Sequence, residues 1–520
     1  MAGVCDYYTF GLSQVAFGTS AAGWALLFQI LSWFNFYCLV RPYSNSAEAV
    51  LATASLYYWA PLIFPTAIER GNGVAVGRKG GRIEDPWPRE TGALLLAAVC
   101  VAVRPTSAAL WTAVGLLRMS TLPLRRLPRY LTLTVIPPVV AVVGASFYLD
   151  SWLYGTATLV PLNFLRFNVL EGQSRIFGEQ AWHWNFSQGL PAVLGAALPL
   201  TLWGFVGGDS SSRGGWCARS GTPRVLGWLA VWFLVYHSTS PHKEFRFLVP
   251  VLPIAHAYAG RAVAGALSRK VGGKVTEGQA VETNKPAEAN PDPVLSRRKW
   301  RKGIAATTFF VHVPAAIYLS IWHQSGALSA VDIVARKIPV MALTKASCRT
   351  GEEASTAGGK SAELGGDEGQ GDRVGAAAVI VHFLMPCHSA PLHSHLHFRD
   401  FDTELWSLDC SPENRARPEG SESDQFLNDP LAFLKATYGA RSDSTNKWNL
   451  DPRLPPLPDL AVMYSTHLDK PGVADFLGEL GLENAAVVFN AHVNGDADSD
   501  DMYDSVVVLE QVNCLADSRY

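Results

Sequence analysis

The feature that most constrains this chain is the repetition of long apolar runs through its first 325 residues. Each run is about as long as a bilayer-spanning helix requires, roughly 20 residues. Because hydrocarbon offers no partner to backbone polar groups, spanning segments must satisfy their own hydrogen bonds, as helices do. We therefore predict an all-α polytopic membrane region with about eight spans, near residues 15–40, 46–68, 92–118, 130–150, 188–207, 225–239, 246–266 and 303–325.

The charge balance argues against binding to nucleic acid, and the positions of the aromatic residues indicate a protein that lies in a membrane. The chain has 43 basic and 45 acidic residues, whereas nucleic-acid-binding proteins usually carry a basic surplus. Many of its 16 Trp residues lie near the ends of the apolar runs, as in the aromatic belts at membrane interfaces. We expect no nucleic-acid partner.

The Lys and Arg residues of the loops predict the orientation of the spans. Basic loops lie between spans three and four and between spans five and six, and a basic segment at 270–300 precedes span eight. If the spans alternate, all three are cytosolic, and the loops near 151–187 and 239–246 face the other side. The loop 69–91 disagrees, because it carries five Lys and Arg residues yet falls on the non-cytosolic side. Either span two or span three is misplaced, or this loop violates the rule.

Composition changes after the membrane domain, which we place at residues 1–330. Residues 331–375 include a stretch rich in Gly, Ala and Glu, and we predict a low-complexity linker there. Between residues 376 and 520 short apolar runs alternate with polar stretches. We predict a small luminal α/β domain for this carboxy-terminal part.

Polar side chains within or beside the spans are candidates for a substrate site. Arg104 interrupts the apolar run "VAVRPTSAALW". Placing a charged side chain inside a span costs free energy, so such a residue indicates a functional site by default. Alternatively, Arg104 snorkels or caps a helix broken by Pro105. The loop after span four places Arg166, Asn168 and His183 among aromatic residues, where they could receive a sugar. An interfacial helix would explain those aromatic residues alone.

The stretch "SPHKEFRFLVPVLPI" places four ionisable residues directly before a span. His242, Lys243, Glu244 and Arg246 form a tight turn on the non-cytosolic side. Cations at headgroup level can bind a lipid-linked phosphate, since contacts there are stronger than in water. Glu244 can orient those cations or accept a proton. The alternative is a solvated turn whose charges pair locally.

Histidines and cysteines near residue 390 raise the question of a metal site. In "HSHLH", a strand would place His393, His395 and His397 on one face, as a metal site requires. No second cluster of ligands accompanies them, and we expect no metal. The eight Cys residues include no C-x-x-C pair, and whether Cys387 and Cys410 are bridged stays open.

The same charged stretch carries a family resemblance. "SPHKEFRFLVPVLPI" resembles the His-Lys-Glu-x-Arg-Phe signature of the lipid-linked mannosyltransferases of glycosyltransferase family 22. From about Cys5 to Leu434, "LSWFNFYCLVRPYSNSAEAVL", "RPTSAALW", "LNFLRFNVL", "WHWNFSQGLP" and "FLMPCHSAPLHSHLH" resemble the branch that adds the third mannose of the GPI anchor. The "MPCHS" block is the more specific mark, because the sister enzymes of N-glycan assembly are not expected to share it.

The resemblance implies a GT-C type fold in the endoplasmic-reticulum membrane. It also implies transfer of an α1,2-linked mannose from dolichyl phosphate mannose to the GPI glycolipid precursor at the luminal face, with no cofactor beyond that donor. Such enzymes invert the anomeric centre while a base removes the proton of the acceptor hydroxyl. The alternatives are a sister α-mannosyltransferase of dolichol-linked N-glycan assembly and an inactive, amino-terminally truncated membrane paralogue.

One element of the family pattern is missing from the sequence. The family carries its presumed catalytic acid in a His-Pro-Asp-Glu motif, in a luminal loop after the first span. No such motif occurs in these 520 residues. We therefore expect that the sequence begins downstream of that loop, or that the chain is an inactive paralogue, and we name no catalytic base.

Overall fold

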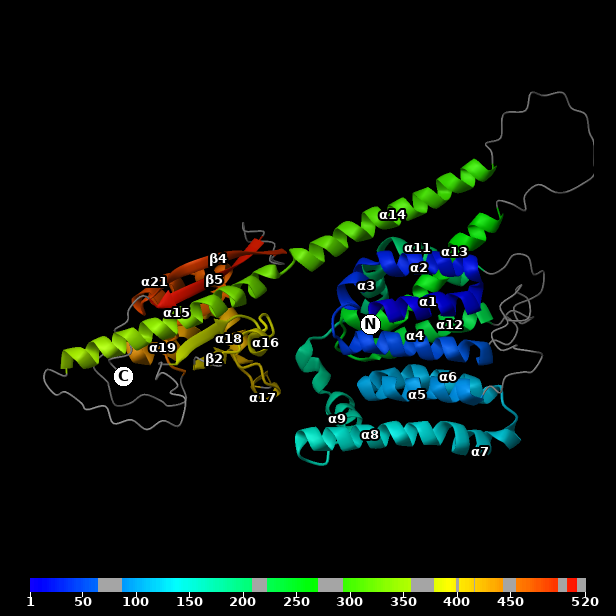
Figure 1. Ribbon diagram of the computed structural model, residues 1–520, viewed down its shortest axis with the longest axis horizontal. Coiled ribbons are helices and arrows are strands. Elements are labelled where there is room, and N and C mark those ends of the chain that lie inside the picture. The colour runs from blue at the N-terminus through cyan, green and yellow to red at the C-terminus, as the bar shows by residue number, and fades with distance from the viewer. Residues whose placement is uncertain are drawn as a thin grey trace, which may run out of the picture. The chain divides into compact units, whose positions relative to one another are not determined.

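The chain folds into two compact units, Met1–Leu319 and Ser320–Tyr520. A computed structural model describes residues 1–63, 87–207, 222–269, 293–356, 378–398, 402–415, 417–442, 455–493 and 503–511. Figure 1 shows many helices of the first unit running roughly side by side. The first unit is helical throughout its described part, and the second contains a sheet.

The helices of the first unit include several short 3₁₀ and π segments. In chain order they are α1 (Ala2–Phe17), α2 (Thr19–Leu31), α3 (Trp33–Cys38), α4 (Ser44–Ile63), α5 (Trp87–Val103), η1 (Pro105–Ser107), α6 (Ala108–Ser120), η2 (Leu124–Arg126), α7 (Leu127–Tyr130), η3 (Leu131–Val135), α8 (Ile136–Tyr154), α9 (Val160–Leu165), η4 (Arg166–Leu170), η5 (Gln173–Phe177), η6 (Asn185–Gly189), α10 (Leu190–Leu194), η7 (Gly195–Ala197), α11 (Leu198–Val206), α12 (Thr222–Thr239), η8 (Phe245–Val251), α13 (Leu252–Arg269) and α14 (Pro293–Ile321).

Four helical stretches are long and apolar enough to cross a membrane, judged over the described residues. This result confirms the prediction of a polytopic, mainly helical membrane protein. The stretches lie within Leu124–Tyr154, Asn185–Val206, Phe245–Leu267 and Arg298–Ser347, and Thr19–Leu31 is a shorter apolar helix.

Helix α1 was not predicted, because its sequence is polar and aromatic rather than uniformly apolar. The chain reverses after it at Gly18, whose φ of 87° suits glycine. Helix α1 packs against α4, where a Cβ atom on Gly11 would lie 2.8 Å from the Tyr57 ring. Tyr8 extends this contact through ring packing on Tyr57 and Tyr58. The bundle therefore begins with a hairpin of α1 and α2.

The predicted single span at 92–118 is wrong, because the structure contains two antiparallel helices there. Helix α5 ends before Arg104, whose extended φ of −141° is typical of a residue that precedes proline. Helix α6 then runs back, and Arg118 near its end pairs with Glu90 in the first turn of α5, Nε to Oε1 at 2.7 Å. The turn between the two helices carries Arg104.

This hairpin changes the sidedness of the loop 69–91. Helix α4 runs antiparallel to α5. The Ser55 hydroxyl donates to the Ala93 carbonyl oxygen at 2.8 Å, and Arg104 Nε, after the end of α5, lies 3.0 Å from Oε2 of Glu48 near the start of α4. The end of α4 and the start of α5 therefore lie at the same end of the bundle as Arg118. We call this end, marked by Glu90 and Arg118, the basic end.

The extra reversal removes the conflict with the positive-inside rule. Residues 69–86 lie outside the described residues, but the two helix ends that they connect belong to the basic end. Span three was misplaced, and the start of α5 lies at the same end of the bundle as Arg118, so the alternation of the spans no longer conflicts with the rule. We call the opposite end, where Ser44, Arg104 and Glu244 lie, the turn end.

The second unit contains a five-stranded sheet in the order β2-β1-β3-β5-β4, which confirms the predicted small α/β domain. Strands β1, β2 and β3 are parallel, and β5 is antiparallel to both β3 and β4. The strands are β1 (Val379–Leu384), β2 (Thr403–Ser407), β3 (Leu460–Tyr464), β4 (Leu482–Val493) and β5 (Tyr503–Gln511).

Helices cover both faces of this sheet. Val381 and Phe383 of β1 pack in a core with helix α15, and Leu384 packs in a second core on the other face. This alternation is the two-residue period of a strand. The helices of the unit are α15 (Ser325–Thr356), α16 (Leu392–His395), α17 (Pro412–Arg415), α18 (Glu422–Asn428), α19 (Pro430–Ser442), α20 (Ser465–Leu468) and α21 (Val473–Glu479).

Helix α15 occupies part of the segment 331–375, for which composition predicted a linker. Val331, Val334 and Ile338 are fully buried in the core against the sheet. The prediction rested on the composition of the whole segment, which combines the apolar start of the segment with the Gly- and Glu-rich stretch that follows. Residues 357–375 lie outside the described residues.

The sidedness of the hairpin is testable with inserted glycosylation sites. An Asn-X-Ser acceptor flanked by flexible spacers is placed either within residues 69–86 or after Gly155, which follows α8 at the turn end. We expect modification only after Gly155, because N-glycosylation takes place on the non-cytosolic side. The measurement is a glycosidase-sensitive shift in electrophoretic mobility. Modification of the insertion at 69–86 contradicts the hairpin topology.

The buried ion pair between Glu48 and Arg104 is testable by a double-variant cycle. Their side chains are 1% and 17% exposed, so removing one partner strands a buried charge. We expect Glu48→Met or Arg104→Met alone to cost about 3–5 kcal/mol and the double variant to recover much of that loss. The free energy of unfolding is measured in detergent. The matched control is Glu171→Ala, which breaks the exposed pair with Arg166 and should cost less than about 1 kcal/mol. Additive losses at the two buried positions contradict the pairing.

Candidate functional site

The candidate site is built around the turn between α12 and η8, residues 240–244. Helix α12 ends at Thr239, and Glu244 adopts an extended conformation before the 3₁₀ segment begins. Pro250 lies inside that segment, and η8 gives way to helix α13 at Leu252. Because the turn has only five residues between two helices, its charged side chains are held close together.

Glu244 is the centre of a charged cluster. Its Oε2 lies 2.6 Å from Arg246 Nε and its Oε1 accepts from Arg246 Nη2 at 2.8 Å, which makes the pair bidentate. His242 Nε2 lies 2.9 Å from the same Oε1, and its Nδ1 faces the Gly178 carbonyl oxygen at 3.3 Å. The turn thus aligns the guanidinium of Arg246 and the imidazole of His242 on one carboxylate.

The electrostatics of Glu244 favour orientation over proton transfer. Burial by itself would raise its pKa, but the hydrogen bonds from His242 and Arg246 and the charge of Arg246 lower the pKa below its ordinary value. A carboxylate with a lowered pKa is ionised at neutral pH and is a weak base. Of the two roles predicted from the sequence, the geometry supports the orientation of the two cations.

Lys243 is placed differently from the other cations of the turn. It is only 6% exposed, and its Nζ donates to the carbonyl oxygens of Gln180 at 3.0 Å and Ser240 at 2.5 Å. The Gln180 N–H in turn donates to the Pro241 carbonyl oxygen at 3.0 Å. Burial lowers the pKa of Lys243. In this structure the ammonium group fixes the turn to the loop before η6.

Arg104 joins the cluster through an aromatic side chain. Its guanidinium lies 5.3 Å from the centre of the Phe247 ring, and that ring lies 5.6 Å from the His242 ring. The Arg104 Nη1 donates to the Ser44 hydroxyl at 3.0 Å. On the other side of the turn, the Arg246 guanidinium lies 5.8 Å from the Tyr43 ring. Helix α4, the α5–α6 turn and η8 therefore converge at the turn end.

The three candidates in the loop after α8 are less closely tied to this cluster. Arg166 is 73% exposed and pairs with Glu171, Nε to Oε1 at 2.7 Å. The Asn168 amide of η4 donates to the Phe164 carbonyl oxygen of α9. His183 Nδ1 lies 2.9 Å from the Ser187 hydroxyl, and its neighbour Trp184 packs against Phe245 of η8. Only the segment around His183 thus reaches the turn.

Sequence reasoning missed three residues of the α4 start: Tyr43, Ser44 and Glu48. Glu48 is the only residue of the apolar helix α4 that is charged at neutral pH, and an isolated carboxylate in such a helix is a signal that could have identified it. Its Oε1 has no hydrogen-bond partner among the described residues. Tyr43 and Ser44 carry no comparable signal, because their role depends on Arg246 and Arg104 from distant segments.

The structure also addresses the metal question and the cysteines. Over the residues that the structure describes, no group of three or more His, Cys, Asp or Glu side chains could hold a metal ion. In place of a strand, Leu392–His395 forms a helical turn. Cys387 and Cys410 form a disulfide.

Among solved structures, two structures of one protein align with most of this chain. The crystal structure of ArnT from Cupriavidus metallidurans bound to undecaprenyl phosphate aligns with 98% of this chain and 82% of that chain, at 12% identity and a TM-score of 0.47. The crystal structure of ArnT in the apo state aligns with a TM-score of 0.45.

Curated proteins give closer relatives. The mannosyltransferase APTG1 of Arabidopsis thaliana is 31% identical over 506 residues, covering 97% of this chain and 74% of its own length. GPI mannosyltransferase 3 of Yarrowia lipolytica is 29% identical, over 94% of this chain and 76% of its own. GPI alpha-1,2-mannosyltransferase 3 of Mus musculus is 27% identical, over 95% and 70%.

The family model of the Alg9-like mannosyltransferases matches residues 1–397. This range includes the whole membrane unit, the turn at 240–244 and the first strand of the carboxy-terminal sheet. The match covers well over half of the 520 residues, and the relatives extend the similarity along nearly all of the remainder. The chain belongs to the Alg9-like mannosyltransferase family.

Proposed function

We propose that this protein transfers the third, α1,2-linked mannose of the GPI anchor from dolichyl phosphate mannose to the GPI precursor, at the luminal face of the endoplasmic reticulum. Family membership makes it a hexosyltransferase of the α-mannosyltransferase class. Several relatives over most of its length are named GPI mannosyltransferase 3 or GPI alpha-1,2-mannosyltransferase 3. A lipid-linked donor and a membrane glycolipid acceptor suit its membrane helices.

The observation that carries the proposal is the position of Arg246. Its side chain is 43% exposed, is aligned by Glu244, and lies at the turn end, opposite the basic loops. A guanidinium there can form paired hydrogen bonds with a lipid-linked phosphate at headgroup depth. Arg104, which packs on Phe247 and is paired with Glu48, lies nearby. We assign the candidate substrate-binding role to this cluster, in which His242 helps to orient Glu244.

The chemistry that this cluster supports is displacement of a phosphate leaving group. The bond from the anomeric carbon of the donor mannose to the dolichyl phosphate oxygen breaks, and a bond to the acceptor hydroxyl oxygen forms with inversion. The electron pair of the broken bond stays on the phosphate, whose growing charge the guanidinium of Arg246 stabilises. The acceptor proton passes to a base. Glu244, held ionised by its cations, is a poor candidate for that base.

The proposal places the parts of the chain on defined sides of the membrane. The loops near 151–187 and 239–246 and the domain at 376–520 are luminal, and the basic segment 270–300 is cytosolic. Within 270–300, residues 270–292 lie outside the described residues. The disulfide between Cys387 and Cys410 supports this placement, since disulfides form in oxidising compartments such as the lumen. The names of the relatives do not favour the alternative of N-glycan assembly.

The phosphate-binding role of Arg246 is tested with the Arg246→Ala variant of the protein, expressed from its own gene. Loss of a charge-assisted contact worth about 1.5–3 kcal/mol should lower turnover by roughly one to two decades. Arg246→Lys should recover only part of the activity, because an ammonium group cannot replace the paired hydrogen bonds. Mannosyl transfer is measured in microsomes with equal amounts of enzyme.

The control for that experiment is Arg129→Ala, which removes an exposed arginine of α7 at the basic end. It should leave transfer unchanged. Near wild-type transfer by Arg246→Ala at limiting enzyme concentration would refute the phosphate role.

The choice of acceptor is tested in cells that lack their own third GPI mannosyltransferase. A precursor with two mannoses accumulates there, and this protein should convert it into the three-mannose form. It should not extend a truncated dolichol-linked oligosaccharide, because a specific site penalises a wrong acceptor by leaving buried polar groups unpaired. Both lipid pools are profiled with labelled mannose. Extension of the oligosaccharide pool alone overturns the assignment to GPI assembly.

A further inference from the structure

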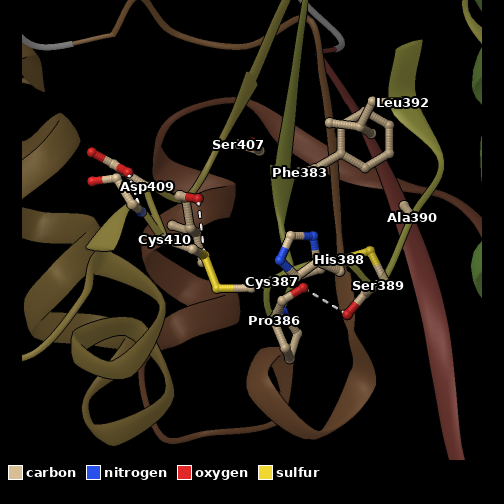
Figure 2. A pocket seen from close by; sticks show the side chains of 13 residues that line it. Phe383, Pro386, Cys387, His388, Ser389, Ala390, Leu392, Ser407, Asp409 and Cys410 are labelled. Carbon is tan, nitrogen blue, oxygen red and sulfur yellow. Dashed lines mark hydrogen bonds between the residues drawn. A yellow bond between two sulfur atoms is a disulfide. The ribbon is translucent and has the colours of Figure 1, made fainter. Parts of the chain in front are cut away.

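The carboxy-terminal unit contains a cavity of about 620 Å³ that the reaction described above does not use. Small-molecule sites are typically about 300–1,000 Å³. The cavity lies where the parallel strands β1 and β2 end, a position at which open α/β sheets commonly bind ligands. Its lining comes from the loop after β1, which contains "MPCHS", and from the loop after β2 (Figure 2).

Two features hold this cavity in shape. The disulfide between Cys387 and Cys410 joins the two loops that line it. His388, next to that bond, has a φ of 65°, which residues other than glycine rarely adopt. Such strain persists where the surrounding structure imposes it, and it is concentrated at functional sites. The fold therefore keeps an imidazole at the cavity at a conformational cost.

The acceptor groups of the cavity are fixed in position. The Asp409 carboxylate accepts from the Ser411 N–H at 2.8 Å and from the Asn414 amide. A carboxylate has about four acceptor positions, so these two bonds orient it and leave capacity for a ligand. The Ser407 side chain and the His388 imidazole add further polar groups to the lining.

The composition of the lining selects the class of ligand. None of the 13 lining residues is Lys or Arg, and one is an aspartate, so the lining disfavours a phosphate or another anion. Phe383 and Leu392 provide an apolar surface opposite the polar groups. A hexose has the matching character, with one apolar face of C–H groups and an edge of hydroxyl groups that act as donors and acceptors.

We infer that this cavity is a second glycan-binding site, which holds neutral mannose units of the acceptor outside the reacting centre. This inference rests on the proposed function for the identity of the sugar. The hydroxyl groups of one mannose unit donate to Asp409, and the C–H face of another lies on Phe383 at the opposite side of the lining (Figure 2). Binding there increases the effective concentration of the acceptor near the membrane site, as linked binding events do.

The test uses the purified full chain in detergent, with a mannobiose that lacks the α1,2 linkage as the probe, because that linkage forms only in the transfer itself. Saturation-transfer NMR titrations give an apparent Kd, and we expect saturable binding to the wild-type protein. Asp409→Asn should weaken it by about tenfold, because a charged acceptor is lost. Absence of saturable binding, equal affinity in Asp409→Asn, or displacement of the sugar by inorganic phosphate overturns the inference.

A glycine substitution separates ligand contact from folding. His388→Gly removes the imidazole and relieves the positive φ, so it should weaken binding while leaving the unfolding temperature the same or higher. The matched control is Gln324→Gly, since Gln324 has a φ of 55° but does not line the cavity. It should leave the affinity for mannobiose unchanged. Unchanged affinity in His388→Gly also counts against the site.

Arg246→Ala distinguishes this site from the proposed reaction centre. It should lose mannosyl transfer and keep mannobiose binding. If transfer is absent from the wild-type protein while binding still depends on Asp409, the proposed function fails and the cavity remains a glycan site. If Arg246→Ala also abolishes mannobiose binding, the probe binds in the membrane unit and the inference fails.

Discussion

The arrangement of the membrane unit depends on a buried ion pair between Glu48 and Arg104. Neither charge is stable alone in a low-dielectric interior, so the two residues constrain each other. This pairing holds the start of α4 against the turn between α5 and α6. Because the same turn packs on Phe247, the pair also positions the segment that follows Glu244. A structural interaction therefore assembles the candidate site from three separate parts of the chain.

Within the charged turn, neighbouring residues have different tasks. Lys243 donates to backbone carbonyl oxygens and holds the loop before η6 in place. Arg246 remains partly exposed and is oriented by Glu244. The neighbouring cations of this turn therefore do not all serve to bind an anion. Burial decides which cation supports the fold and which can bind a ligand, and Glu244 links His242 to Arg246.

Much of the fold followed from the sequence, because apolar runs of bilayer length permit few structures other than helices. The α5–α6 hairpin did not follow, since hydropathy averaged over a window hides a reversal marked only by Arg104 and Pro105. The charged cluster was predicted because its residues are adjacent. The burial of Lys243 depends on Gln180, more than 60 residues away, and the order of the strands depends on similarly distant pairings. Local pattern carries no information about such contacts.

The short helices of the hairpin have a consequence for the surrounding lipid. Helix α6 has 13 residues and α5 has 17, which gives lengths of about 20 and 26 Å. Both are shorter than the roughly 30 Å of a typical hydrocarbon core. Such a mismatch is relieved by thinning of the adjacent bilayer. Where the hairpin borders lipid, such thinning would bring a headgroup phosphate closer to Arg104 while the lipid tail stays in the membrane.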